Sequence, residues 1–265
     1  MNNTFYVAKN GNDTSGNGSC GLPFLTIQKA LDSMTGDRNA IIVNSGVYTE
    51  NLTFTYSGLI YISMVSASIV GNISWTNAST TSYQAKLIFE GHEMRSAYPI
   101  YLSNVIDGNL TVTHTYTDSE RYASVHLIGL GVRGNITFVS NNSITNDIMH
   151  LFMQNSSWTG TLSAIDGAFC GLYAWASEGS SATGLGAATG NVRPHLLQSC
   201  NIAGVWTPVS ALGSCRFNDT RFASLAHDFS GLTVSTLSMD ANSFASYKAN
   251  VPTPSPSTVT LIDDA

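Results

Sequence analysis

The chain has 265 residues, 43% of them hydrophobic, so it can bury a core, and its length fits one elongated domain or two small ones. Only 11% of the residues are charged, and the formal net charge of −6 comes without a cluster of Lys or Arg, which argues against binding to nucleic-acid phosphates. We expect no membrane span, because no run of about 18 apolar residues is present. The 4 cysteines form no Cys-x-x-Cys pair, which argues against a zinc site.

Residues 1–50 are predicted to form an N-terminal cap and the first strands. Phe5–Ala8 has the composition of a strand, and the Gly-, Asn- and Ser-rich stretch that follows predicts turns. Thr26 is placed to cap a short helix that ends at Leu31, with Phe24, Ile27, Ala30 and Leu31 on its apolar face. The end of a stack of strands exposes unpaired backbone groups, so we expect this helix to cover it. The first residues carry neither the basic nor the apolar segment of a signal peptide.

A short repeat follows within residues 51–250, and each copy alternates apolar and polar residues as a strand does. Its copies are Glu50–Phe54, Gly71–Trp75, Gly108–Val112, Gly134–Phe138 and Gly160–Ala164. A second strand-like series precedes the last four copies, at Ile60–Ile62, Ile100–Leu102, Val125–Leu127 and Met149–Leu151. Two short strands cannot close a core alone, but stacked repeats of roughly 20–30 residues bury a continuous interior. The sequence therefore predicts an all-β fold, a single-stranded parallel β-helix or solenoid with a short N-terminal capping helix.

Residues 251–265 are predicted to be a Pro/Ser linker, which includes PTPSPS, followed by a strand-like C-terminal tail. Chain ends are ordered mainly where something holds them. We therefore expect the tail to pack on a neighbouring chain or surface.

Three segments of the first coil, YVAKNGNDTSGNG, PFLTIQKAL and IIVNSGVYTENL, resemble the N-terminal cap and first turn of the pectate-lyase-like superfamily. The resemblance covers residues 5–54 and implies a right-handed parallel β-helix. That superfamily includes polysaccharide lyases, glycoside hydrolases, phage tail spikes, virion proteins and cell-surface adhesins. The resemblance therefore predicts a fold and leaves several functions open.

Enzymes of this kind carry clustered acidic residues, which hold calcium in the lyases and perform acid–base chemistry in the hydrolases. Here the outward positions of the repeat hold Asn, Thr and Ser, and the one Asp-Asp pair, Asp263-Asp264, lies in the tail. We predict no cofactor, no metal site and no established catalytic residue. The best catalytic candidates are Glu90, His92, Glu93 and Arg95, for which a solvated, ion-paired loop is the favoured interpretation.

A second candidate set is the outward column Tyr61, Tyr101, His126 and His150, which would form a ladder if the strands stack in register. Such a ladder could bind glycans or a partner protein. We favour the simpler interpretation, in which the rings stack on each other or lie under a neighbouring subunit. Asn-x-Ser/Thr sequons recur in the repeat, and their glycosylation stays open.

We expect a non-enzymatic structural protein of a virus particle, at the virion surface on a capsid or spike. It would contribute to particle assembly or host attachment, as a homo- or hetero-oligomer with other virion or capsid proteins and with glycans as candidate ligands. Two alternatives stay open: a polysaccharide lyase or glycoside hydrolase of the β-helix type, and a secreted, extracellular cell-surface adhesin.

Overall fold

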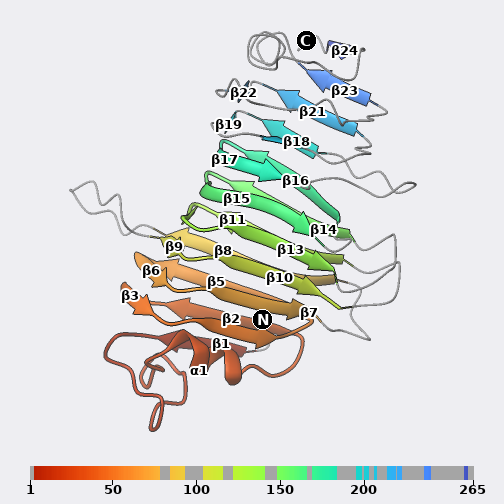
Figure 1. Ribbon diagram of the computed structural model, residues 1–265. Helices are drawn as coiled ribbons and strands as arrows, with labels where there is room; N and C mark the ends of the chain where they lie inside the picture. The colour runs from red at the N-terminus through yellow and green to blue at the C-terminus, as the bar shows by residue number, and fades with distance from the viewer. Residues whose placement is uncertain are drawn as a thin grey trace, which may run out of the picture.

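The computed structural model is described over residues 3–77, 84–92, 104–115, 122–140, 148–165, 169–183, 195–198, 200–202, 206–207, 214–218, 220–222, 236–239 and 260–261. Within these residues the chain forms one short helix and two large sheets, of 11 and 13 strands. Every hydrogen-bonded pair of named strands is parallel. Figure 1 shows the strands stacked from the N-terminal end towards the C-terminal end.

This architecture corrects the predicted fold class, because the described strands belong to two separate parallel sheets rather than to a single-stranded, right-handed β-helix solenoid. The period-2 pattern and the repeat indicate strands that stack in parallel. They do not determine how consecutive strands divide between sheets. The all-parallel pairing and the small helix content agree with the prediction from the sequence, whereas the division into two sheets does not.

The first sheet runs the length of the described chain. In spatial order its strands are β1 (Asn3–Val7), β2 (Arg38–Val43), β5 (Leu59–Val65), β8 (Gln84–His92), β11 (Tyr122–Ile128), β14 (Ile148–Gln154), β16 (Phe169–Trp175), β18 (His195–Gln198), β21 (Ser214–Asn218), β23 (Thr236–Met239) and β24 (Thr260–Leu261).

The second sheet has two arms that meet at the long strand β15 (Ser157–Ile165). One arm contains β3 (Gly46–Thr49), β6 (Ala67–Val70), β9 (Val105–Asp107) and β12 (Gly131–Val132). The other contains β4 (Leu52–Thr55), β7 (Ile73–Asn77), β10 (Leu110–His114) and β13 (Ile136–Ser140). Beyond β15 lie β17 (Glu178–Thr183), β19 (Asn201–Ile202), β20 (Trp206–Thr207) and β22 (Arg221–Phe222).

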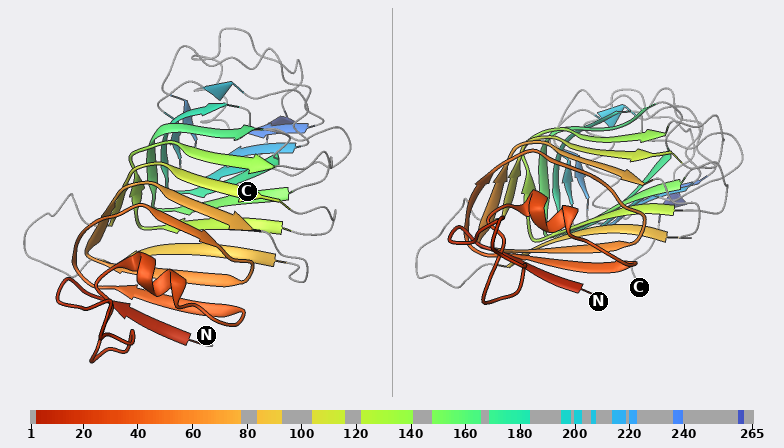
Figure 2. Two further views of the ribbon diagram at one scale, coloured as in Figure 1. Left: turned by 60° about the horizontal axis from the view of Figure 1, so that its bottom comes forward. Right: turned by 90° about the horizontal axis from the view of Figure 1, so that it is seen from below.

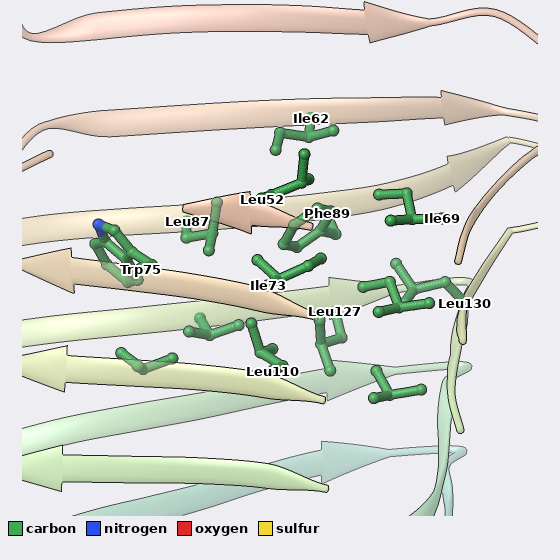
Figure 3. Close-up of a cluster of buried hydrophobic side chains, with 14 of the residues drawn as sticks. Leu52, Ile62, Ile69, Ile73, Trp75, Leu87, Phe89, Leu110, Leu127 and Leu130 are labelled. Atoms are coloured by element: carbon green, nitrogen blue, oxygen red, sulfur yellow. The ribbon is translucent and has the colours of Figure 1, made fainter. Parts of the chain in front are cut away.

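The sequence repeat lies in the second arm and pairs in register. Its central apolar residues are direct neighbours from strand to strand, in the order Leu52, Ile73, Leu110, Ile136 and Leu162. These side chains are buried, and they meet buried side chains of the first sheet such as Leu87 and Leu127 (Figure 3). Burial of one such side chain stabilises a fold by about 1.5–3 kcal/mol. The repeat is therefore the pattern of one wall of the core.

The predicted N-terminal helix is present as α1 (Ile27–Asp32), and the side chain of Thr26 caps it by accepting from the backbone N–H of Lys29. Figure 2 shows α1 at the N-terminal end of the stack. The Gln28 side chain donates to the carbonyl of Thr53 at 3.0 Å and accepts from its N–H at 2.9 Å. The amide of Gln28 thus takes the place of a neighbouring strand along the edge of β4, which is how the helix covers that edge.

The C-terminal strand β24 pairs with β23 of the same chain. Of the predicted tail, the structure describes Thr260 and Leu261, and these two residues pair with the chain's own sheet rather than with a neighbouring chain. The PTPSPS segment lies outside the described residues. The proposed boundaries after residues 50 and 250 stay predictions. No helix within the described ranges is long and apolar enough to cross a membrane.

Candidate functional site

Three polar side chains meet on the outer face of the first sheet, where β5 and β8 are neighbours. The Tyr61 hydroxyl donates to Glu90 Oε2 at 2.5 Å and lies 3.4 Å from His92 Nε2. His92 Nε2 in turn lies 3.6 Å from Glu90 Oε1. Glu90 and His92 are two residues apart on β8, so they share a face, and their side chains are 30% and 46% exposed. We call this group the Tyr61 cluster.

The electrostatics of the Tyr61 cluster do not favour acid–base chemistry by the tyrosine. Burial, followed by the hydrogen bond and charge of Glu90, raises the pKa of Tyr61 to about 12. A phenol that holds its proton this firmly does not act as a base near neutral pH. The structure therefore brings together two of the four catalytic candidates, Glu90 and His92. Glu93 and Arg95 lie outside the described residues.

The predicted binding column is only partly a structural row. Tyr61 lies opposite Ile88 on β8, and Ile88 lies opposite His126 on β11. His126 then pairs with Phe152, whereas His150 lies opposite Ser124, one step along the same face. Tyr101 is outside the described residues.

The aromatic ladder of this protein consists of His126, Phe152 and Tyr173, on β11, β14 and β16. The ring centroids of His126 and Phe152 are 4.5 Å apart and their planes differ by 15°. Phe152 and Tyr173 are 4.8 Å apart with an angle of 13°. The ring of His150 lies tilted beside this stack, 5.8 Å from Phe152 and 5.5 Å from Tyr173. Both faces of Phe152 are thus covered by neighbouring rings, which leaves neither face open for stacking on a sugar.

His126 is uncharged at neutral pH in this ladder. Burial, and then the positive charge of Lys86 on β8, lowers the pKa of His126 to about 4. Its Nε2 atom is buried and has no hydrogen-bond partner in the described part of the protein. The histidine therefore behaves as an aromatic ring of the stack.

Phe152, Tyr173 and Ile88 were not among the residues predicted from the sequence. The second strand-like series was aligned through Ile100 and Met149, whereas Leu87 and Leu151 are the neighbours of Val125. Aromatic pairing could not have corrected this register, because His126 meets one ring whether it is paired with His150 or with Phe152.

The outward asparagines of the repeat form a second ladder, at the turn that precedes β4, β7, β10 and β13. Asn51 Oδ1 accepts from the backbone N–H of Asn72 at 2.8 Å, and Asn72 Oδ1 accepts from that of Asn109 at 3.0 Å. Asn109 Oδ1 accepts from Asn135, and Asn135 Oδ1 accepts from Thr161, both at 2.8 Å. Each side chain thus satisfies a backbone donor of the next strand layer, which explains why asparagine recurs.

A glycine precedes three of these asparagines, and space requires it. A Cβ atom on Gly108 would lie 2.0 Å from the carbonyl oxygen of Gly71, and one on Gly134 would lie 2.3 Å from that of Gly108. Contacts this short do not occur between real atoms, so the chain can pass closely over itself only with glycine here.

Across the described ranges, no group of three or more His, Cys, Asp and Glu side chains is arranged to hold a metal ion. No protein-family model matches the chain, and neither a curated protein nor a solved structure matches it. These comparisons give no support to the virus, capsid and spike terms predicted from the sequence, and nothing in them identifies the pectate-lyase-like superfamily.

Proposed function

We propose that this protein is a non-enzymatic structural scaffold whose stacked parallel sheets present a polar, weakly charged surface to a partner. The observation that carries this proposal is the asparagine ladder. The outward positions of the repeat, where an enzyme would need carboxylates, are occupied by amides that bond one strand layer to the next. These positions serve the stack itself.

The other candidate groups also interact within the protein. Phe152 lies between two rings, and Glu90 accepts from Tyr61 while it faces His92. Glycans therefore have less support than a protein partner as ligands of this face, since both faces of the central ring, Phe152, are covered and cannot stack on a sugar.

The location and the partner stay predictions. A place at a virion surface, contacts with other virion proteins and a role in assembly or host attachment rest on the sequence resemblance alone, so the scaffold proposal does not include them. An extracellular adhesin is compatible with the same scaffold.

A polysaccharide lyase or hydrolase is the second candidate, and the Tyr61 cluster is the observation in its favour. It combines a carboxylate, an imidazole and a phenol within hydrogen-bonding reach on an accessible face. A single carboxylate falls short of the pair that glycoside hydrolysis normally uses.

Cleavage assays separate these two functions. We expect no cleavage when the full chain is incubated with acidic and neutral polysaccharides, followed by reducing ends and by the absorbance of unsaturated uronic acids. The matched variants are Glu90→Gln and Asp107→Asn, the latter an exposed carboxylate on the second sheet that pairs with Arg133. Cleavage by the wild type that is lost in E90Q and retained in D107N would overturn the scaffold proposal.

A further inference from the structure

We propose that the aromatic ladder is a pH-sensitive element: on acidification His126 takes up a proton, its ring leaves the stack, and one face of Phe152 becomes exposed. This goes beyond the scaffold role, because it gives one face of the scaffold two states.

The position of His126 makes its protonated form unfavourable in the stack. The imidazole lies 4.5 Å from the Phe152 ring, and its buried Nε2 has no hydrogen-bond partner within the described residues. A protonated imidazole carries an N–H on both nitrogens. In this place the Nε2–H would lack an acceptor, and a buried donor without an acceptor costs free energy that an open ring in water does not.

The charged and titratable groups around His126 do not compensate for a second proton. On β8, Lys86 and Glu90 lie on the same face on either side of Ile88, the direct neighbour of His126. Lys86 opposes protonation, and Glu90 is already bound by Tyr61 of β5 and faces His92.

On the other side of β11, the strands β14 and β16 place no acidic residue beside the ring of His126. On β14, His150 flanks Phe152, and on β16 Tyr173 covers the far face of Phe152. On β11 itself the neighbours on the same face are the neutral residues Ser124 and Ile128. A charge on His126 would thus lie beside the ring of Phe152 and the positive charge of Lys86, and the nearest acidic residue on β8, Glu90, already interacts with Tyr61 and His92.

The linkage between protonation and stacking has a definite sign. The pKa of His126 is lowered from 6.5 to about 4 in the stack, so the stacked state binds fewer protons than the open state. For a histidine with a lowered pKa, stacking is fully favoured above about pH 6.5 and weakens as the pH falls towards 4. At about pH 5 the ratio of open to stacked protein should rise by roughly 20-fold over its value at pH 7.

The opening is confined to the outer face of the sheet. The residues that alternate with His126, Val125 and Leu127, point into the core and are 1% and 0% exposed. They hold the backbone of β11 in place while an outward side chain changes its position. The expected acid form is therefore a folded protein with an altered aromatic surface.

The test is an acid titration of the full chain between about pH 7 and pH 4, followed by near-ultraviolet circular dichroism and by hydrogen exchange of β11 and β14. The variant His126→Phe keeps an aromatic ring that cannot be protonated. The control His92→Gln removes an imidazole on the same sheet that lies outside the ladder. We expect a reversible loss of aromatic signal in the wild type and in H92Q, and none in H126F at the same pH.

The same transition in H126F, or no transition in the wild type, would overturn the proposal. A direct reading of the His126 imidazole by NMR in the wild type decides the matter if H126F does not fold. A midpoint of the His126 titration below about pH 6 supports the proposal. A midpoint at or above about pH 6 contradicts the proposal, because an imidazole in water titrates near 6.5.

Discussion

The two ladders of this protein stack side chains along the same direction by different physical means. The asparagine ladder is held by hydrogen bonds from each amide to the next strand layer, and the glycines before it leave no spare volume. The aromatic ladder is held by ring contacts on an outer sheet face. The first requires one residue type at each step, whereas the second accepts His, Phe and Tyr in one stack. Directional hydrogen bonds thus restrict each position of the ladder to one residue type, whereas ring stacking restricts only the shape and polarity of the side chain.

The glycine positions of the asparagine ladder should give the largest effect. In Gly108→Ala the new Cβ would lie 2.0 Å from the Gly71 carbonyl oxygen, which cannot move without separating two layers. We expect a loss of about 3–5 kcal/mol in the free energy of unfolding, measured by chemical denaturation. Gly21→Ala is the matched control, since a Cβ there meets nothing within 4 Å. Equal stability of the two variants would mean that the close approach of the layers is not maintained in solution.

The aromatic ladder should respond less strongly to a change at its centre. Phe152→Ala removes the two ring contacts at 4.5 and 4.8 Å together with a half-buried apolar surface, for an expected loss of about 2–3 kcal/mol. Phe152→Leu keeps most of that apolar surface but cannot stack, so it should lose about 1 kcal/mol. Denaturation of both variants separates burial from stacking. If F152L is as stable as the wild type, ring stacking does not hold this face together.

The same contrast explains how far the sequence could predict the structure. The repeat in Leu52, Ile73, Leu110 and Ile136 marks strands whose neighbours were identified correctly, because an asparagine directly precedes each of these residues. The predicted register of the first sheet was wrong at His150, which lies opposite Ser124 rather than His126. The connections between these strands differ in length, and no directional hydrogen bond marks which outward side chains are neighbours. Of the Tyr61 cluster, Glu90 and His92 were found from their charge.

The sequence did not reveal the two-sheet arrangement or the partners of Tyr61. Alternation of apolar and polar residues records which way a side chain points, and it is the same whether the strands form one sheet or two. The contact between Tyr61 and Glu90 joins residues 29 positions apart, and it depends on the offset between β5 and β8. That offset is set by the turns on both sides, which carry no pattern that a single sequence exposes.

The smallest effects should come from the asparagines themselves, and they should depend on position in the ladder. Asn109→Ala removes the acceptor for the Asn135 N–H and the donor to Asn72 Oδ1, whereas Asn51→Ala removes one acceptor at the end of the ladder. These bonds are exposed, so water replaces part of each. We expect losses of about 1 kcal/mol for N109A and about 0.5 kcal/mol for N51A in chemical denaturation. Asn44→Ala, an exposed asparagine outside the ladder, should be neutral. A larger loss in N51A than in N109A would contradict a ladder whose central members each bond to two neighbours. The stability of the asparagine ladder would then come from its tight turns rather than from the side-chain hydrogen bonds, and hydrogen bonding would no longer distinguish it from the aromatic ladder.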